Sequence, residues 1–185
     1  MRLFIAIQFT EPLALELQKA VRSLRKQAAF GTFTRPENLH LTLAFIGETQ
    51  RVEAVEEVLQ KVCRSHPSFP LTLRGAGHFS ALYWAGLERS RQLTALASDL
   101  QAELRSAGFD IEERPFKPHI TLGRRIVPRT APRPAAAPGT AQEAPISLQL
   151  QPLTMETCWV SLMRSDRIDG VLTYTELSSY KLAGR

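Results

Sequence analysis

Two short segments, far apart in the chain, carry the same pattern of a histidine followed two residues later by a threonine. The first is HLTL at residues 40–43, and the second is HITL at residues 119–122. Residues i and i+2 of a β-strand point to the same face, so each segment predicts a strand with His and Thr on one face and apolar side chains on the other. The chain is therefore expected to hold two rigid strands that each present an imidazole and a hydroxyl group.

The similarity between the two halves extends well beyond these motifs, at an offset of 79 residues (119 minus 40). A shift by this offset, without gaps, superposes several identical pairs: Leu3 and Leu82, Ala6 and Ala85, Leu17 and Leu96, Ala28 and Ala107, Phe30 and Phe109, Arg35 and Arg114, and Pro36 and Pro115. We interpret this as a duplicated strand–helix–strand unit. Coincidence in an Ala- and Leu-rich sequence is the alternative, and the gapless register counts against it.

The duplication predicts a single domain over residues 1–185, with repeat unit one at about 1–80 and repeat unit two at about 81–185. The expected fold class is α+β: two lobes of mainly antiparallel sheet, related by a pseudo-twofold axis, with helices outside and the two His-x-Thr motifs in a central cleft. Spacing of apolar residues predicts helices that include residues 13–24, 55–62 and 93–104. Thr10 is expected to cap the first helix, and Gly108 to end the third. Strands are expected at 3–9, 40–47, 71–74, 81–87, 119–122, 147–152, 157–163 and 172–181, and a loop at 30–38.

Residues 127–145 differ from the rest because Pro, Ala and Thr dominate and no apolar periodicity is present. Such a composition buries too little apolar surface to offset the entropy lost on ordering, so we predict a mobile loop.

Composition sets broad limits on function. A hydrophobic content of 44% with 22% charged residues is ordinary for a globular protein, and the formal net charge of +5 weakly favours polyanionic partners.

No run approaches the roughly 18 apolar residues that cross a membrane. The basic and apolar start of the chain is interrupted by Gln8 and Glu11, which argues against a signal peptide. Cys63 and Cys158 show neither disulfide nor metal spacing. We expect a cytoplasmic protein, monomeric and without membrane contact.

The sequence resembles the 2H phosphoesterase superfamily, and within it the RNA 2′,3′-cyclic phosphodiesterases, or 2′-5′ RNA ligase-like proteins. The resemblance rests on RLFIAI at residues 2–7, PENLHLTLAFIGE at 36–48 and FKPHITL at 116–122, with further similarity at 77–79 and 83–84. It implies hydrolysis of RNA-terminal or nucleoside 2′,3′-cyclic phosphate to a 2′-phosphate, without metal or other cofactor.

The residues suit that chemistry. Opening a cyclic phosphate needs a base to deprotonate water and an acid to protonate the leaving ribose oxygen. His40 and His119 are each able to hold either role near neutral pH, and the sequence leaves the assignment open. Thr42 and Thr121 are expected to donate hydrogen bonds to the phosphate oxygens. Arg124 occupies the position of the family's phosphate-binding arginine, although the neighbouring Arg125 competes for that role.

Other residues near the motifs have two interpretations. Phe79, Tyr83 and Phe116 are candidates to stack on a base, although core packing is the commoner fate of aromatic residues. Arg35 and Arg114 either neutralise the cleft or pair with carboxylates. The family's Gly-x-x-Tyr appears here as GVLTY at residues 170–174, one residue longer, so a substrate contact from this region is in doubt.

The partners expected are RNA ends or nucleoside 2′,3′-cyclic phosphates. Reversible 2′-5′ ligation of RNA ends is a rival within the same class, because one transition state serves both directions. An RNA- or nucleotide-binding module with little turnover is the alternative from a different class.

Overall fold

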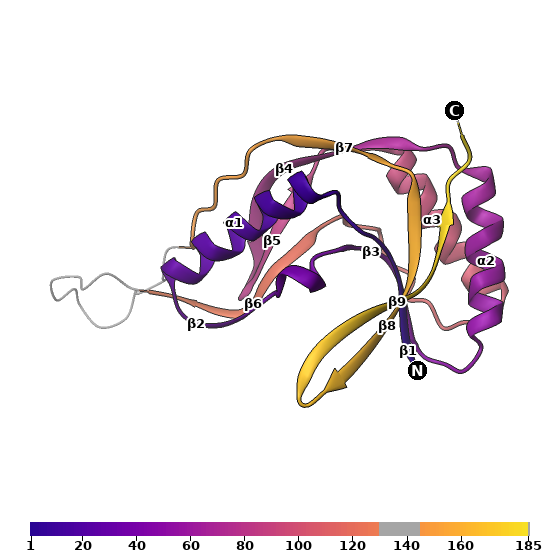
Figure 1. The fold of residues 1–185 in the computed structure, drawn as a ribbon, viewed down its shortest axis with the longest axis horizontal. Coiled ribbons are helices and arrows are strands. Elements are labelled where there is room, and N and C mark those ends of the chain that lie inside the picture. Colours follow the sequence, from indigo (N-terminus) through magenta and orange to yellow (C-terminus); the bar gives the residue numbers. More distant parts are fainter. Residues whose placement is uncertain (130–144, 185) are drawn as a thin grey trace, which may run out of the picture.

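A computed structural model describes residues 1–129 and 145–184, and it confirms the predicted α+β class. The described residues form two antiparallel sheets, with strand order β3-β1-β8-β9 in the first and β2-β6-β5-β4-β7 in the second (Figure 1). The elements in chain order are β1 (Arg2–Ile7), α1 (Glu11–Gln27), β2 (Ala28–Phe33), the 3-10 turn η1 (Pro36–Asn38), β3 (Leu41–Glu48), α2 (Val52–Ser65), β4 (Phe69–Phe79), β5 (Leu82–Leu87), α3 (Arg91–Ser106), β6 (Ile120–Pro128), β7 (Leu153–Thr157), β8 (Trp159–Ile168) and β9 (Val171–Lys181).

At the 79-residue offset, β1, α1 and β3 of the first half match β5, α3 and β6 of the second in type and order. The two halves nevertheless exchange elements. Strand β4 leaves the first half to pair with β5, and β8 leaves the second half to pair with β1. Helix α1 follows β1 but packs against β2 and β6 of the other sheet, whereas α3 follows β5 and packs against α2 and β3 (Figure 1). Each sheet thus contains strands from both halves of the chain.

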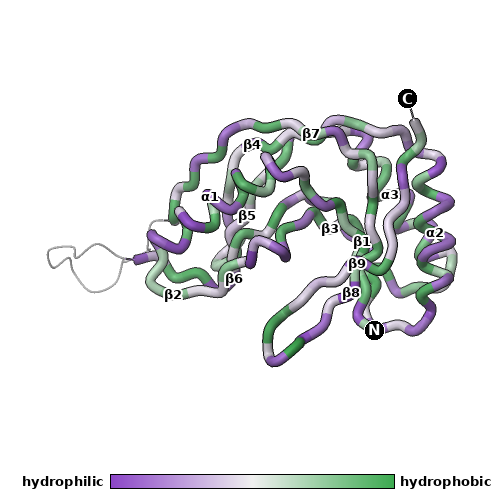
Figure 2. Tube along the Cα trace, viewed as in Figure 1, coloured by the Kyte–Doolittle hydropathy of each residue, from purple (hydrophilic) through white to green (hydrophobic). Residues whose placement is uncertain are grey.

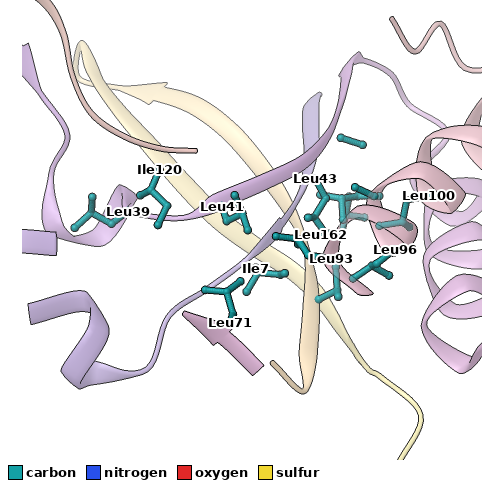
Figure 3. Packing of buried hydrophobic residues seen from close by; sticks show 14 of the residues in the cluster. Ile7, Leu39, Leu41, Leu43, Leu71, Leu93, Leu96, Leu100, Ile120 and Leu162 are labelled. Atoms are coloured by element: carbon teal, nitrogen blue, oxygen red, sulfur yellow. The ribbon is translucent and has the colours of Figure 1, made fainter. Parts of the chain in front are cut away.

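The helices pack through the apolar stripes that their spacing predicts. Leu93, Leu96 and Leu100 of α3 are buried and lie next to Leu43 of β3 and Leu162 of β8 (Figure 3). Burying one such side chain contributes about 1.5–3 kcal/mol, so this stripe fixes α3 against the first sheet. Helix α2 likewise contains both hydrophilic and hydrophobic residues along its length (Figure 2).

Both helix ends lie where the sequence predicts them, but the expected side-chain cap at Thr10 is not formed. Gly108 has φ +81° and follows α3; the Phe109 amide donates to the Leu104 carbonyl at 3.0 Å, and the Gly108 amide to that of Arg105 at 2.9 Å. This is the Schellman arrangement, which favours glycine at this position. Thr10 is the N-cap of α1, but its side chain makes no capping bond; its hydroxyl lies 4.0 Å from the sulfur of Met155.

Several predicted boundaries are wrong, and three of them lie at tertiary contacts. The expected loop at 30–38 overlaps β2 (Ala28–Phe33), an edge strand that pairs with β6. Strand β4 does not end at the glycines but continues to Phe79. Gly77 packs against the Trp84 indole of β5, and a Cβ at this position would come within 2.4 Å of that ring. Residues 147–152 form no strand. There the Gln151 amide donates to the buried Glu16 carboxylate at 3.0 Å, and this bond holds the pKa of Glu16 below its usual range.

The predicted mobile loop at 127–145 begins too early. Strand β6 extends to Pro128, with Val127 opposite Phe30 and Pro128 opposite Ala28, because the edge strand β2 supplies a partner. Residues 130–144 of that prediction lie outside the described residues. Among the helices that are described, none is long and apolar enough to span a bilayer.

Candidate active site

The two motif histidines occupy equivalent positions, each one residue before a strand. His40 precedes β3 and His119 precedes β6, so the predicted strands begin one residue later than expected. In each case Nδ1 lies 2.8 Å from the carbonyl oxygen two residues earlier, at Asn38 and at Lys117. A carbonyl only accepts, so Nδ1 carries the proton in the neutral ring and Nε2 carries the lone pair. The backbone therefore selects the same tautomer at both sites.

The turn before His40 is anchored to the rest of the fold. Asn38 ends η1, its side chain is 6% exposed, and its Nδ2 donates to the Leu172 carbonyl of β9 at 2.9 Å. This bond ties the carbonyl that orients His40 to the β8–β9 hairpin. Lys117, the equivalent residue in the second half, is exposed.

Aromatic rings enclose His40. Its ring lies 4.9 Å from that of Phe4 and 5.1 Å from that of Tyr174, which meets it edge-on at 85°. The Thr42 hydroxyl lies 2.9 Å from Nε2 and donates to it. Burial lowers the pKa of His40 most, and the positive charge of Arg124 lowers it further, while the bond to the Asn38 carbonyl opposes both. Neutral imidazole is thus the favoured form of His40 near pH 7.

His119 is more open. It is half-buried, and the nearest aromatic ring is that of Phe79, edge-on at 6.1 Å. The structure gives Nε2 of His119 no hydrogen-bond partner within residues 1–129 and 145–184. This nitrogen is therefore available to a ligand.

The two motifs meet at one cleft of about 580 Å³. Its lining includes Thr42 from the first half, and His119 and Arg124 from the second. His40 joins this group through its bond to Thr42 and through the charge of Arg124. Neither His40 nor Thr121 is itself among the lining residues. Thr121 is half-buried on β6, and its carbonyl accepts a bond from the Thr34 hydroxyl at 2.8 Å.

The structure distinguishes Arg124 from Arg125, the two adjacent candidates for the phosphate contact. Arg125 has φ +54°, and its Nη2 donates to the Thr32 hydroxyl at 2.8 Å. Arg124 lines the cleft, and its charge lowers the pKa of Tyr174, although burial raises that pKa more. Arg124 is therefore the arginine placed for an anion.

The other two arginines are held by nearby carboxylates. Arg35 pairs with Glu37 at 3.4 Å, and Arg114 pairs with Glu112 at 3.3 Å. Both ion pairs are exposed, so they add little to stability. Arg114 also lines the cleft together with Glu112, so both predicted roles apply to it, whereas Arg35 is not among the lining residues.

The aromatic candidates divide into accessible and buried rings. Tyr83 is 3% exposed and its hydroxyl accepts a bond from the Ile146 amide, which excludes it from stacking on a base. Phe116 lines the cleft but packs partly against the core, whereas Phe79 lines the cleft and is 49% exposed. Phe79 is therefore the ring best placed to meet a base.

Three neighbours of His40 were not predicted as such from the sequence. Phe4 and Asn38 lie in the segments 2–7 and 36–48 that carry the resemblance, but neither was singled out as a neighbour of His40. Asn38 contacts His40 through the local backbone, whereas the Phe4 contact depends on the pairing of β1 with β3. Tyr174 is the third, and the GVLTY segment that it ends was the available signal for it.

An α+β fold of two antiparallel sheets, with paired His-x-Thr segments at one cleft, defines a 2H phosphoesterase. The family model for the 2′-5′ RNA ligase superfamily matches residues 13–169, and the chain belongs to this family. An RNA 2′,3′-cyclic phosphodiesterase of Thermotoga maritima is 37% identical over 131 residues, which cover 67% of this chain and 70% of that protein. A second protein of that name, from Methanothermobacter thermautotrophicus, is 29% identical over 98% of each chain.

Solved structures share the whole architecture. The Thermus thermophilus protein TT0787 superposes with a TM-score of 0.79 at 28% identity and covers 100% of this chain and 99% of its own. Escherichia coli LigT in complex with 3′-AMP gives a TM-score of 0.79 at 28% identity, over 98% of this chain and 97% of its own. The likeness therefore includes a structure with a bound nucleotide.

Proposed function

We propose that this protein hydrolyses 2′,3′-cyclic phosphates at RNA ends or on nucleosides, and leaves a 2′-phosphate. One observation carries the proposal: two histidines share the same backbone-selected tautomer, and both relate to Arg124, which lines the cleft with His119 and whose charge acts on His40. The names of the Thermotoga and Methanothermobacter relatives, and the nucleotide bound to LigT, support the same class of substrate.

The reaction follows from two imidazoles of opposite protonation state. One accepts a proton from water at Nε2 as the water oxygen attacks phosphorus. The other delivers a proton from Nε2 to the ribose O3′ as the P–O3′ bond breaks. Buried and close to Arg124, His40 favours the neutral form that a base requires, and the open His119 then serves as the acid. Each Nδ1–H remains hydrogen-bonded to its backbone carbonyl oxygen, so only Nε2 gains or loses a proton during the reaction.

Charge on the phosphate is balanced by three residues. Thr42 turns its hydroxyl from His40 to a non-bridging oxygen, and Arg124 supplies a charge-assisted bond. Thr121 takes the equivalent role to Thr42 in the second motif. Phe79 offers its exposed face beside His119 for the base of the cyclic nucleotide.

A turnover assay tests this function. Purified protein is incubated with 2′,3′-cyclic mononucleotides in the presence of EDTA, and formation of the 2′-phosphate is followed. We expect turnover that EDTA does not reduce, because the mechanism uses side chains alone. Binding of these nucleotides without turnover would instead favour an RNA- or nucleotide-binding module.

The setting of the activity is also a proposal. We expect the protein to act as a cytoplasmic monomer, because each lobe takes strands from both halves of one chain and the site is complete within it. Size-exclusion chromatography with light scattering tests the monomer, and cell fractionation tests the location.

A further inference from the structure

The sheet face that holds Arg124 continues outward along β2 and β6, which lie side by side at one end of the second sheet (Figure 1). Arg124 lines the cleft and lies opposite Thr32 of β2, and Val127 lies opposite Phe30. Opposite residues of an antiparallel pair point to the same face, and Phe30 and Thr32 are two residues apart on β2. These side chains therefore share the face that opens into the cleft, here called the β2–β6 face.

The opposite face of the same two strands packs on helix α1. A Cβ on Gly31 would clash with Ile126, and a Cβ on Gly123 would meet both Ile126 and Leu24 of α1. Ile126 and Leu24 are buried. The helix thus covers one side of β2 and β6, and the β2–β6 face lies on the other side.

An irregularity in β6 brings a second arginine to the β2–β6 face. Between the two opposed pairs, β6 has one residue more than β2, so the register shifts there, as in a β-bulge. Adjacent residues of a regular strand point to opposite faces, but Arg125 has φ +54°, and its Nη2 reaches the Thr32 hydroxyl at 2.8 Å. A guanidinium has five N–H donors, so this one bond leaves others available to a ligand.

The segments that form this region are strongly basic. Residues 17–36 and 114–129 contain no Asp or Glu, and their cations are Lys19, Arg22, Arg25, Lys26, Arg35, Arg114, Lys117, Arg124, Arg125 and Arg129. Within residues 1–129 and 145–184, Arg124, Arg125 and Arg129 form no ion pair. A surface of this charge, continuous with a phosphate-binding cleft, complements a polyanion.

An exposed aromatic ring accompanies these charges. Phe30 is 65% exposed, the highest value among the large apolar side chains that the structure describes, and Val127 opposite it is also exposed. Aromatic rings stack on unpaired bases, while nearby arginines contact the phosphates of the same strand. Arg124 and Val127 are at most about 10 Å apart along β6, at roughly 3.3 Å per residue. Stacked nucleotides advance about 3.4 Å each, so Phe30 lies within about three nucleotides of a phosphate at Arg124.

We propose that the β2–β6 face binds the single-stranded RNA that leads to the terminal cyclic phosphate. The inference rests on the proposed function, in which Arg124 contacts the cyclic phosphate itself. Phe30 stacks on a base upstream of the terminal nucleotide, and Arg125 contacts a phosphate between that base and the end. The preferred substrate is then an unpaired RNA 3′ end of several nucleotides, and a cyclic mononucleotide uses only part of the site.

The test compares a single-stranded pentaribonucleotide that ends in a 2′,3′-cyclic phosphate with a 2′,3′-cyclic mononucleotide. The quantity measured is the ratio of kcat/KM for the pentanucleotide to kcat/KM for the mononucleotide. We expect a ratio of about ten or more for the wild-type protein, and a ratio about tenfold lower for Phe30→Ala, the usual scale for loss of one base–aromatic stack. Leu15→Ala is the control, because Leu15 is an exposed apolar residue of α1, behind the sheet, and the ratio should stay at the wild-type value.

Salt dependence tests the arginine separately, without turnover. The probe is a fluorescent pentanucleotide that ends in a 2′-phosphate, the expected product, and its Kd is measured by anisotropy at several salt concentrations. Each phosphate contact adds about 0.7 to the slope of log Kd against log salt for a single strand. Arg125→Gln should therefore reduce this slope by about 0.7. Arg22→Gln removes the same charge from the exposed surface of α1 and should leave the slope unchanged.

The outcomes separate this inference from the proposed function. Equal wild-type kcat/KM on both substrates would overturn the RNA-binding face and leave the hydrolase intact. A Phe30→Ala variant with an unchanged ratio and an altered oligomeric state in light scattering would also overturn it, because the face would then bind a second copy of the chain. Turnover of neither substrate would reject the proposed function, and the salt slopes of Arg125→Gln and Arg22→Gln would still support or overturn RNA binding at this face.

Discussion

The two histidine motifs share one hydrogen bond to the backbone, but the side chains around the two imidazoles differ. Each Nδ1 lies 2.8 Å from the carbonyl two residues earlier. His40, however, is enclosed by Phe4 and Tyr174, bonded to Thr42 and influenced by Arg124. His119 touches the edge of Phe79 and keeps Nε2 without a partner among the described residues. Local sequence sets the tautomer of both rings, and tertiary burial lowers the pKa of His40.

This difference suits the proposed division of roles between an acid and a base. Two identical sites would favour neither role at a given pH. At the first motif, β9 brings Tyr174 against His40, and burial lowers the pKa of that ring. Part of the asymmetry therefore comes from β9, which lies beyond both His-x-Thr segments.

The largest expected effect is loss of either histidine. His40→Ala and His119→Ala should each lower kcat on a 2′,3′-cyclic mononucleotide by about 100-fold or more, the usual scale of positioned acid–base groups. The double variant should be scarcely slower than either single one, because the two residues act as a unit. His66→Gln, which alters a histidine that pairs with Asp99 outside the cleft, is the control. A histidine whose removal left kcat unchanged would contradict the two-imidazole mechanism.

A smaller effect is expected from Arg124→Gln. Loss of a charge-assisted phosphate contact should lower kcat/KM about tenfold. Since the guanidinium charge disfavours imidazolium, its removal should also raise the pKa of His40, measured by NMR titration of the ring protons. Arg125→Gln, which alters the residue bonded to Thr32, should leave that pKa in place. A pKa of His40 that fell in Arg124→Gln would show that the charge acts in the opposite sense.

The two turns that precede the histidines provide a stability comparison. Asn38→Ala removes the bond to the Leu172 carbonyl and should lower the free energy of unfolding by about 1 kcal/mol. Lys117→Ala alters the exposed equivalent and should change it by less than about 0.5 kcal/mol. Urea denaturation of both variants measures the difference. Equal values would mean that the Asn38 anchor does not distinguish the two motifs.

The smallest effect is expected from residues 130–144, which stand at the 79-residue offset from α2. Their composition predicts that folding does not require them. Replacement by Gly and Ser of equal length should shift Tm by less than about 2 °C. A loss of several degrees would show that the segment packs on the core. Reduced activity on long RNA, with mononucleotide turnover retained, would assign it to polynucleotide binding.

The sequence predicted what depends on local pattern: the α+β class, the apolar faces of the three helices, the glycine after α3 and the two motifs. It did not predict features that depend on a distant partner. Strand β2 has no clear alternation, and only its pairing with β6 makes it a strand. The choice of Arg124 over Arg125 follows from the positive φ of Arg125 and its bond to Thr32.

The exchange of strands between the halves also sets the order in which the protein is able to assemble during synthesis. Strand β1 leaves the ribosome first, yet its neighbour β8 pairs Met163 with Phe4 from near the other end of the chain. At about 5–20 residues per second, the nascent chain waits on the order of ten seconds or more for that partner. Tyr174 arrives later still, so His40 gains this enclosing ring only after β9 has been synthesised. A truncated product released early would carry both histidines and lack the environment that makes them different.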